Sequence, residues 1–385
     1  MQTLKSIKNN FVSELQDAYA GKKTSLPFII HKISKNPIVK DSETFHVLVI
    51  GGTVAKVAAL RKNGERINIL GKQDDQVNFQ TEEDFLSFAE SKIKQNINVL
   101  ALNFAYPMTP IFENGRLDGI LLSATKEGKF KGLVGRKIGK DIEDYVLKKR
   151  NKKITVSVAN DTVCLLLSGL TRYKLLSLAA GIVGTGLNFA LFLDSERLVN
   201  LESANFDKFP QSMEGKIIDR ESDRPGKSLF EKETAGAYLY KHFNLIIKQR
   251  KIDHPPINST EELNELCHPE FISEAVLSSI QESKNRSLNK FGMTKKQVQH
   301  DMVEVSKIAQ DLLRRSAQLI ACQIAGITEF KQRSMIFNME GSLFWKANGY
   351  KETVEQTVKQ LVPQYNVEFV EIKDSGILGA AKLVS

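Results

Sequence analysis

Two segments far apart in the chain repeat one pattern, and this repeat limits the possible folds more than any other feature. The segment VLVIGGTVAKVAAL (47–60) can be laid on AGIVGTGLNFALFL (180–193) without a gap. Each has four mostly apolar residues, a turn of Gly and Thr, and a second apolar run, which predicts a β-hairpin. Either segment alone indicates only a tight turn, because any such hairpin uses glycine. Together they suggest two related lobes whose turns bring backbone N–H groups close to the phosphates of one nucleotide.

The rest of the chain alternates between predicted strands and helices. A helix is expected before Gly21, because apolar residues recur there at helical spacing, and another is expected to begin near Thr81. The region 205–330 is predicted to be mainly helical. Further strands are expected at 99–104, 154–158, 335–337 and 367–372, and further helices at 351–361 and near the C-terminus.

The composition is that of a globular protein, with 42% apolar and 26% charged residues among 385. The formal net charge of +9 leaves a nucleic-acid binder as one minor possibility. The basic residues are scattered among acids, however, and the densest group, 148–153, is read as a solvated connector. An anionic small substrate such as a nucleotide explains the mild basicity equally well.

The cysteines and the apolar stretches exclude several classes of protein. The three cysteines are far apart and in no CxxC spacing, so neither a disulfide framework nor a zinc site is indicated. The uncharged stretch 175–193 contains three glycines and Asn188, which favours strand–turn–strand over a membrane span. Glu14 and Asp17 argue against a mitochondrial transit peptide, so a cytoplasmic location is expected.

Short motifs along nearly the whole chain occur in the order typical of one family. They are Leu26-Pro27, Gly51-Gly52-Thr53, Phe104-Ala105-Tyr106-Pro107, Thr125-Lys126, Asn160-Asp161-Thr162-Val163, Gly184-Thr185-Gly186-Leu187-Asn188, Asn200-Leu201-Glu202, Pro225 to Leu239, Glu340-Gly341-Ser342 and Ser375-Gly376. In this order they resemble the hexokinase family, within the actin and heat-shock ATPase superfamily. The resemblance implies an α/β, two-lobed actin-like ATPase (ribonuclease H-like) fold, with mixed sheets flanked by helices and a central cleft.

The resemblance also implies a division of the chain into three parts. Residues 1–40 would form a helix and connector packing on the large lobe, 41–160 the small lobe, and 161–385 the large lobe. The terminal helix, from about 377, would return toward the small lobe. A monomer or homodimer is expected.

The resemblance assigns roles to individual residues. Asp161 would be the base that orients the attacking sugar hydroxyl in phosphoryl transfer from ATP; taken alone, it could instead cap a helix beginning at Thr162. The hexose would be bound by Thr125, Lys126, Asn160, Asn188, Glu202 and Glu231. The ATP would meet Gly51, Gly52, Thr53, Lys56, Gly184, Thr185, Gly186, Gly341, Ser342, Ser375 and Gly376. Mg²⁺ would be held by ATP and water, with no direct protein ligand. Lobe closure would expel water before transfer.

Four positions depart from the family pattern. Val49 stands where the family has an Asp that helps hold the water shell of magnesium, and Lys56 replaces an Arg. Ala105 replaces a Ser, and Glu340 replaces an Asp. Two hypotheses follow. The chain is an active hexose kinase, most simply a 6-OH kinase of glucose or a related hexose. Alternatively, it is a regulatory protein that binds sugar or nucleotide with weak or no catalysis.

Overall fold

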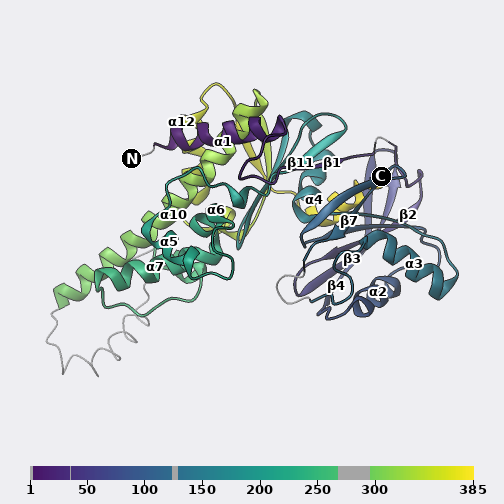
Figure 1. The fold of residues 1–385 in the computed structure, drawn as a ribbon, viewed down its shortest axis with the longest axis horizontal. Helices are drawn as coiled ribbons and strands as arrows, with labels where there is room; N and C mark the ends of the chain where they lie inside the picture. Colours follow the sequence, from purple (N-terminus) through teal and green to yellow (C-terminus); the bar gives the residue numbers. More distant parts are fainter. Residues whose placement is uncertain (1–2, 35, 124–128, 268–294) are drawn as a thin grey trace.

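Two β-sheets, each containing one of the glycine hairpins, form the frame of the protein (Figure 1). The computed structural model describes residues 3–34, 36–123, 129–267 and 295–385. Within these ranges one main sheet has five strands and the other has six. The five-stranded sheet with its helices is called the small lobe, and the six-stranded sheet with its helices the large lobe. This arrangement confirms the predicted two-lobed α/β architecture.

The small-lobe sheet has the strand order β4-β3-β2-β5-β8. The first three strands pair antiparallel, and β5 and β8 run parallel to β2. Helices α2 and α3 pack on one face over a core of apolar side chains, and α2 begins after a capping box at Thr81, as predicted. The elements are β2 (Thr44–Ile50), β3 (Val54–Asn63), β4 (Arg66–Gln76), α2 (Glu82–Ser91), β5 (Val99–Phe104), the separate hairpin β6 (Met108–Glu113) and β7 (Arg116–Leu121), α3 (Ile138–Arg150) and β8 (Thr155–Ala159).

The large-lobe sheet repeats this order and adds one edge strand. Its order is β1-β11-β10-β9-β12-β13, with β9, β10 and β11 antiparallel and with β12 and β13 parallel to β9. The repeat predicted from the two hairpins therefore extends to five strands of each sheet. The strands are β1 (Ile29–Lys32), β9 (Leu178–Val183), β10 (Leu187–Phe192), β11 (Arg197–Asn200), β12 (Met335–Glu340) and β13 (Val367–Val370).

The two hairpins differ in pairing register by one residue. Ile50 pairs with Ala55 in the small lobe, whereas Val183 pairs with Leu187 in the large lobe. Four residues thus separate the last pair of the first hairpin, and three separate that of the second. Because side chains alternate between the faces of a strand, this shift changes which residues of the second strand face the same way as the first.

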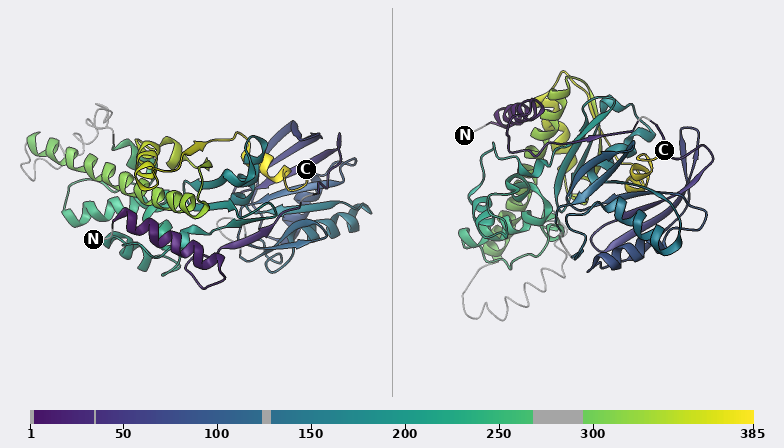
Figure 2. Two further views of the ribbon diagram at one scale, coloured as in Figure 1. Left: turned by 90° about the horizontal axis from the view of Figure 1, so that it is seen from above. Right: turned by 45° about the vertical axis from the view of Figure 1, so that its right-hand side comes forward.

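Long helices cover the outer face of the large-lobe sheet. The N-terminal helix α1 (Leu4–Tyr19) lies along α10 (Lys295–Lys331), where Gly326 leaves room for the Phe11 ring (Figure 2). The predicted helical region 205–330 is confirmed over its described residues, although a break at Ala235 divides the segment after 228. The remaining helices of this lobe are α5 (Met213–Arg220), α6 (Leu229–Thr234), α7 (Gly236–Arg250), α8 (Thr260–Glu265), α11 (Ser342–Lys346) and α12 (Tyr350–Leu361), with 3-10 turns at Gly169–Thr171, Leu175–Ser177 and Ser203–Asn205.

Two short helices, α4 (Asp161–Ser168) and α13 (Ser375–Ala381), lie between the sheets (Figure 1). They pack tightly on one another, because a Cβ on Gly379 would come within 1.7 Å of the Cys164 carbonyl oxygen. A single apolar core joins these helices to the inner faces of both sheets. The uncharged stretch 175–193 forms a 3-10 turn and the β9–β10 hairpin, as predicted. Among the helices described, none has the length and apolar character needed to cross a membrane.

Candidate active site

Asp161 begins α4 directly after the small-lobe strand β8. The Asn160 side chain caps this helix by accepting a hydrogen bond from the Thr162 backbone N–H at 3.0 Å. The Oδ1 atom of Asp161 accepts from the same N–H at 2.7 Å and from the Thr162 hydroxyl at 3.2 Å. The alternative that Asp161 caps a helix starting at Thr162 is therefore wrong by one residue. The partial positive charge of the helix N-terminus attracts the Asp161 carboxylate.

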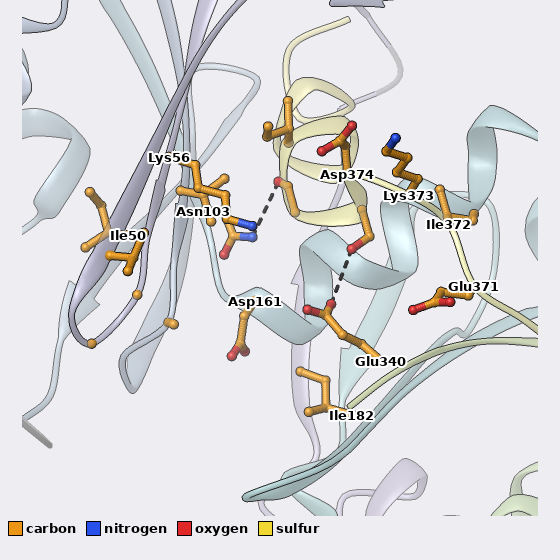
Figure 3. A pocket seen from close by; sticks show the side chains of 18 of the residues that line it. Ile50, Lys56, Asn103, Asp161, Ile182, Glu340, Glu371, Ile372, Lys373 and Asp374 are labelled. Carbon is orange, nitrogen blue, oxygen red and sulfur yellow. Dashed lines mark hydrogen bonds between the residues drawn. The ribbon is translucent and has the colours of Figure 1, made fainter. Parts of the chain in front are cut away.

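A cavity of about 800 Å³ lies between the lobes, and Asp161 lines it (Figure 3). The Asp161 carboxylate points into the space between the β2–β3 turn and Glu340. Residues from several segments that are far apart in the sequence meet at this cavity. The predicted site residues that line this cavity are Gly51, Gly52, Thr53, Lys56, Asp161, Ser375 and Gly376.

Glu340, at the end of β12, contributes a second carboxylate to this cavity. Its Oε2 atom accepts a hydrogen bond from the Ser375 hydroxyl at 3.3 Å. Burial raises the pKa of the Glu340 carboxyl, and the negative charges of Asp161 and Glu371 add to the rise. The Ser375 hydrogen bond and the Lys56 charge oppose it. A charged ligand that enters the cavity would therefore change the pKa of the Glu340 carboxyl.

A chain of amides and a carboxylate extends from α4 into the large lobe. The Asn188 amide nitrogen donates to the Thr162 hydroxyl at 3.2 Å and to Asn200 Oδ1 at 2.7 Å. The Asn200 amide in turn donates to Glu202 Oε1 at 2.8 Å. Burial raises the pKa of the Glu202 carboxyl, and the Asp161 charge raises it further, while the two amides oppose the rise. This set offers several donors and acceptors, as recognition of a polyhydroxylated molecule requires.

The glycine turn of the large lobe is held from several sides. The Glu231 carboxylate accepts from the Leu187 N–H at 3.0 Å. The first two N–H groups of α7 donate to the carbonyl oxygens of Gly184 and Thr185, at 2.8 and 3.1 Å. Glu231 therefore supports the turn directly, whatever further role its side chain has.

A second cavity, of about 330 Å³, is lined by Gly184 and Thr185 of this turn. Gly341 stands in the chain between Glu340, which lines the first cavity, and Ser342, which lines the second. Its φ is +119°, and a Cβ there would lie 2.2 Å from the Val183 carbonyl oxygen, so the backbone approach requires glycine. The residues of the second cavity include Gly184, Thr185, Gly236, Tyr240, Asn258, Thr260, Ser342 and Lys346.

The remaining predicted site residues lie outside the first cavity or outside the described residues. The predicted site residues that line neither cavity are Asn160, Asn188, Glu202, Glu231, Gly186 and Gly341. Thr125 and Lys126 fall outside the described residues. Sequence reasoning gave no role to Asn103, which lines the first cavity, although a lone amide in the buried strand Val99–Phe104 was a usable signal. It also gave no separate role to Asn200, although this residue stood within a recognised motif.

The chain is similar to known hexokinases in sequence and in fold. One hexokinase family model matches residues 178–385, and a second matches residues 1–171. A hexokinase from Kluyveromyces lactis is 23% identical, with 99% of this chain and 88% of the relative covered. One from Emericella nidulans is 25% identical, with 94% and 81% covered. The structure of a Schistosoma mansoni hexokinase complexed with glucose superposes with a TM-score of 0.77 at 20% identity, covering 99% of this chain and 94% of that one.

Proposed function

Because the chain belongs to the hexokinase family, we propose that it is a sugar kinase that transfers the γ-phosphoryl group of ATP to a hexose hydroxyl. The observation that carries this proposal is the position of Asp161. Its carboxylate lines a cavity shared by both lobes, and the adjacent α4 residue Thr162 is hydrogen-bonded to Asn188. A proton acceptor thus adjoins both a space for phosphates and a set of groups suited to a sugar.

The sugar would bind the amides and carboxylate beside α4. Asn188 and Glu202 present hydrogen-bonding atoms there, and Asn200 links them. Asn160 and Glu231 would complete the set, together with Thr125 and Lys126. The similar Schistosoma mansoni hexokinase was solved in complex with glucose, which supports a hexose as the acceptor. The terminal hydroxyl of glucose or a related hexose is the acceptor we propose.

The transfer would use Asp161 as the base. The hydroxyl oxygen attacks the γ-phosphorus and forms the new P–O bond, while its proton passes to the Asp161 carboxylate. The bond between the γ-phosphorus and the bridging oxygen breaks, and that oxygen leaves with ADP. The balance closes with a sugar phosphate, ADP and one proton held by the protein.

The nucleotide would extend from the second cavity to the first. The adenosine would lie near Ser342 in the second cavity, and the phosphates would pass the Gly184-Thr185-Gly186 turn toward Gly52 and Thr53. The carboxylates of Asp161 and Glu340, which line the first cavity, could accept hydrogen bonds from the water shell of a cation bound to ATP. Mg²⁺ bound to ATP would neutralise negative charge on the phosphates during transfer.

The alternative function, sugar or nucleotide binding with little catalysis, is favoured by one observation. Val49 lines the first cavity and lies close to the start of α13 at Gly376, so it presents methyl groups where a phosphate-bound cation would be. Retention of the Asp161 carboxylate in the same cavity favours the enzyme.

A panel of hexoses decides between these functions. ADP release with Mg·ATP is measured by a coupled assay for each sugar, and binding of the same sugars is measured by calorimetry. We expect turnover with at least one hexose. Sugar binding without ADP release across the whole panel would contradict the kinase and support the regulatory alternative.

A further inference from the structure

Corresponding rows of side chains cross the two sheets and face the first cavity. In the small lobe Val49 pairs with Lys56 on β3 and with Asn103 on β5. Strands in a sheet are about 4.8 Å apart, so these side chains are immediate neighbours on one face. All three line the cavity that contains Asp161.

The large-lobe row places a carboxylate at the position that corresponds to Asn103. Ile182, the counterpart of Val49 in the hairpin repeat, pairs with Glu340 on β12. Both also line the first cavity. Strands that correspond in the two sheets therefore bring an oxygen-bearing side chain to the cavity from each side, Glu340 from the large lobe and Asn103 from the small lobe.

Of the two polar atoms of the Asn103 amide, the nitrogen has a hydrogen-bond partner and the oxygen has none. Its nitrogen donates to the Gly376 carbonyl oxygen at 3.4 Å (Figure 3), and because a carbonyl only accepts, this contact sets the orientation of the amide. The Oδ1 atom has no hydrogen-bond partner, although the side chain is only 3% exposed. An unpaired buried acceptor destabilises the folded state, and a bound water or ion is one explanation for such a group in a native structure.

We propose that Asn103 Oδ1 accepts a hydrogen bond from a water of the hydrated divalent cation that enters with ATP. This inference rests on the proposed function. It gives Asn103, which is not part of the recognised sequence motifs, the role of accepting a hydrogen bond from cation-bound water on the small-lobe side. Val49, its neighbour, has no acceptor to offer. A neutral amide attracts a cation less than a carboxylate does, so the chain requires more metal than one with an acid in this row.

Manganese provides a probe that does not depend on turnover. Binding of Mn²⁺ to the protein with ATP, without sugar, is followed by electron paramagnetic resonance. Asn103→Leu keeps the side-chain volume and removes the oxygen, and we expect it to weaken Mn²⁺ binding about tenfold, as for other groups that hold metal-bound water. Asn103→Asp is expected to tighten it.

A second substitution tests whether position, rather than general damage, causes the loss. Val49→Asp places a carboxylate on the adjacent strand, and we expect it to restore Mn²⁺ binding in the Asn103→Leu background. Asn338→Leu is the matched control, because this buried amide also has an unpaired Oδ1 atom but lines neither cavity described above. It should lower stability and leave Mn²⁺ binding unchanged.

The outcomes separate this inference from the proposed function. Equal Mn²⁺ binding by the wild type and Asn103→Leu, or equal losses in Asn103→Leu and Asn338→Leu, would overturn the role of Asn103 while hexose turnover still stood. Asn103-dependent Mn²⁺ binding without turnover of any hexose would support the role of Asn103 and contradict the kinase.

Discussion

The rows of side chains that cross the two sheets have the same position in the fold and different chemistry. The small-lobe row is Lys56, Val49 and Asn103, and the large-lobe row is Asn188, Ile182 and Glu340. Each has an apolar residue in the middle and polar residues on both sides. The small-lobe row combines a cation with an amide, whereas the large-lobe row combines an amide with a carboxylate.

The supports of the two glycine turns differ as well. Glu231, the N-terminus of α7 and the backbone of Gly341 hold the large-lobe turn. The contacts described for the small-lobe turn are fewer, namely the Gly51–Val54 backbone bond, a bond from Val77 to Thr53 and one from the Tyr106 hydroxyl to Gly51. The large-lobe turn is thus held by more of the contacts described, and Lys56 gives the small-lobe row a positive charge that the large-lobe row lacks. The two sheets therefore share a strand order, while the side chains at corresponding positions differ in chemistry.

The largest effect is expected at Asp161, which lines the first cavity together with residues of both rows. Asp161→Asn keeps an oxygen that can accept from Thr162 and removes the proton acceptor, so we expect turnover to fall by about 10²–10⁴-fold with sugar affinity nearly unchanged. Rate and calorimetry on the same preparation measure the two quantities. A variant that kept most of its rate would place the base elsewhere and break the proposed division between the lobes.

The next effect concerns the support of the large-lobe turn. Gly341→Ala would push a Cβ against the Val183 carbonyl at a φ of +119°, and we expect a loss of about 3 kcal/mol or more in the free energy of unfolding. Gly349→Ala is the matched control, because Gly349 also has positive φ but no atom within 4 Å of a Cβ; it should lose only about 1 kcal/mol. Denaturant titration measures both, and equal losses would show that the contact with Val183 does not hold the turn.

The smallest effect is a change in pH dependence at Glu202. Its pKa is raised above the ordinary value of 4.5, mainly by burial, so its contribution to stability is present below that value and is lost as pH rises through the folded-state pKa. Glu202→Gln removes the buried charge, and we expect its melting temperature at pH 7 to rise by about 1–3 °C while sugar affinity falls.

Glu340→Gln sharpens this test, because the pKa of Glu340 is also raised by burial but this residue lies in the other part of the site. It should show the same sign of stability change without losing sugar affinity in the absence of nucleotide. Melting curves from pH 4 to 8 and calorimetry measure the two properties. A loss of sugar affinity in both variants would mean that the sugar and phosphate regions are not separate.

Much of this architecture was predictable from the sequence. The hairpin repeat and the ordered motifs indicated two lobes, and they named several of the residues that line the first cavity with Asp161 but missed others, such as Asn103. The motifs could not predict that Gly184 and Thr185 line a different cavity from Gly51 and Gly52. Glu340 and Ser342, on either side of Gly341, line different cavities, and Gly341 closely approaches Val183, which is far from it along the chain.

The local pattern of apolar residues, glycine turns and caps determined the hairpins and the start of α4, because these depend on backbone preferences and on neighbours a few residues away. Strand register could not be read from the gap-free alignment and was seen only in the paired strands of the structure. In the gap-free alignment Lys56 corresponds to Phe189. In the structure Lys56 pairs with Val49, but the equivalent partner of Ile182 is Asn188 and not Phe189. The difference arises because the second turn has one residue fewer. The single-residue shift turns Phe189 into the core and Asn188 toward α4. Side-chain alternation makes the two faces of a strand exclusive, and only the packing of the whole sheet selects between them.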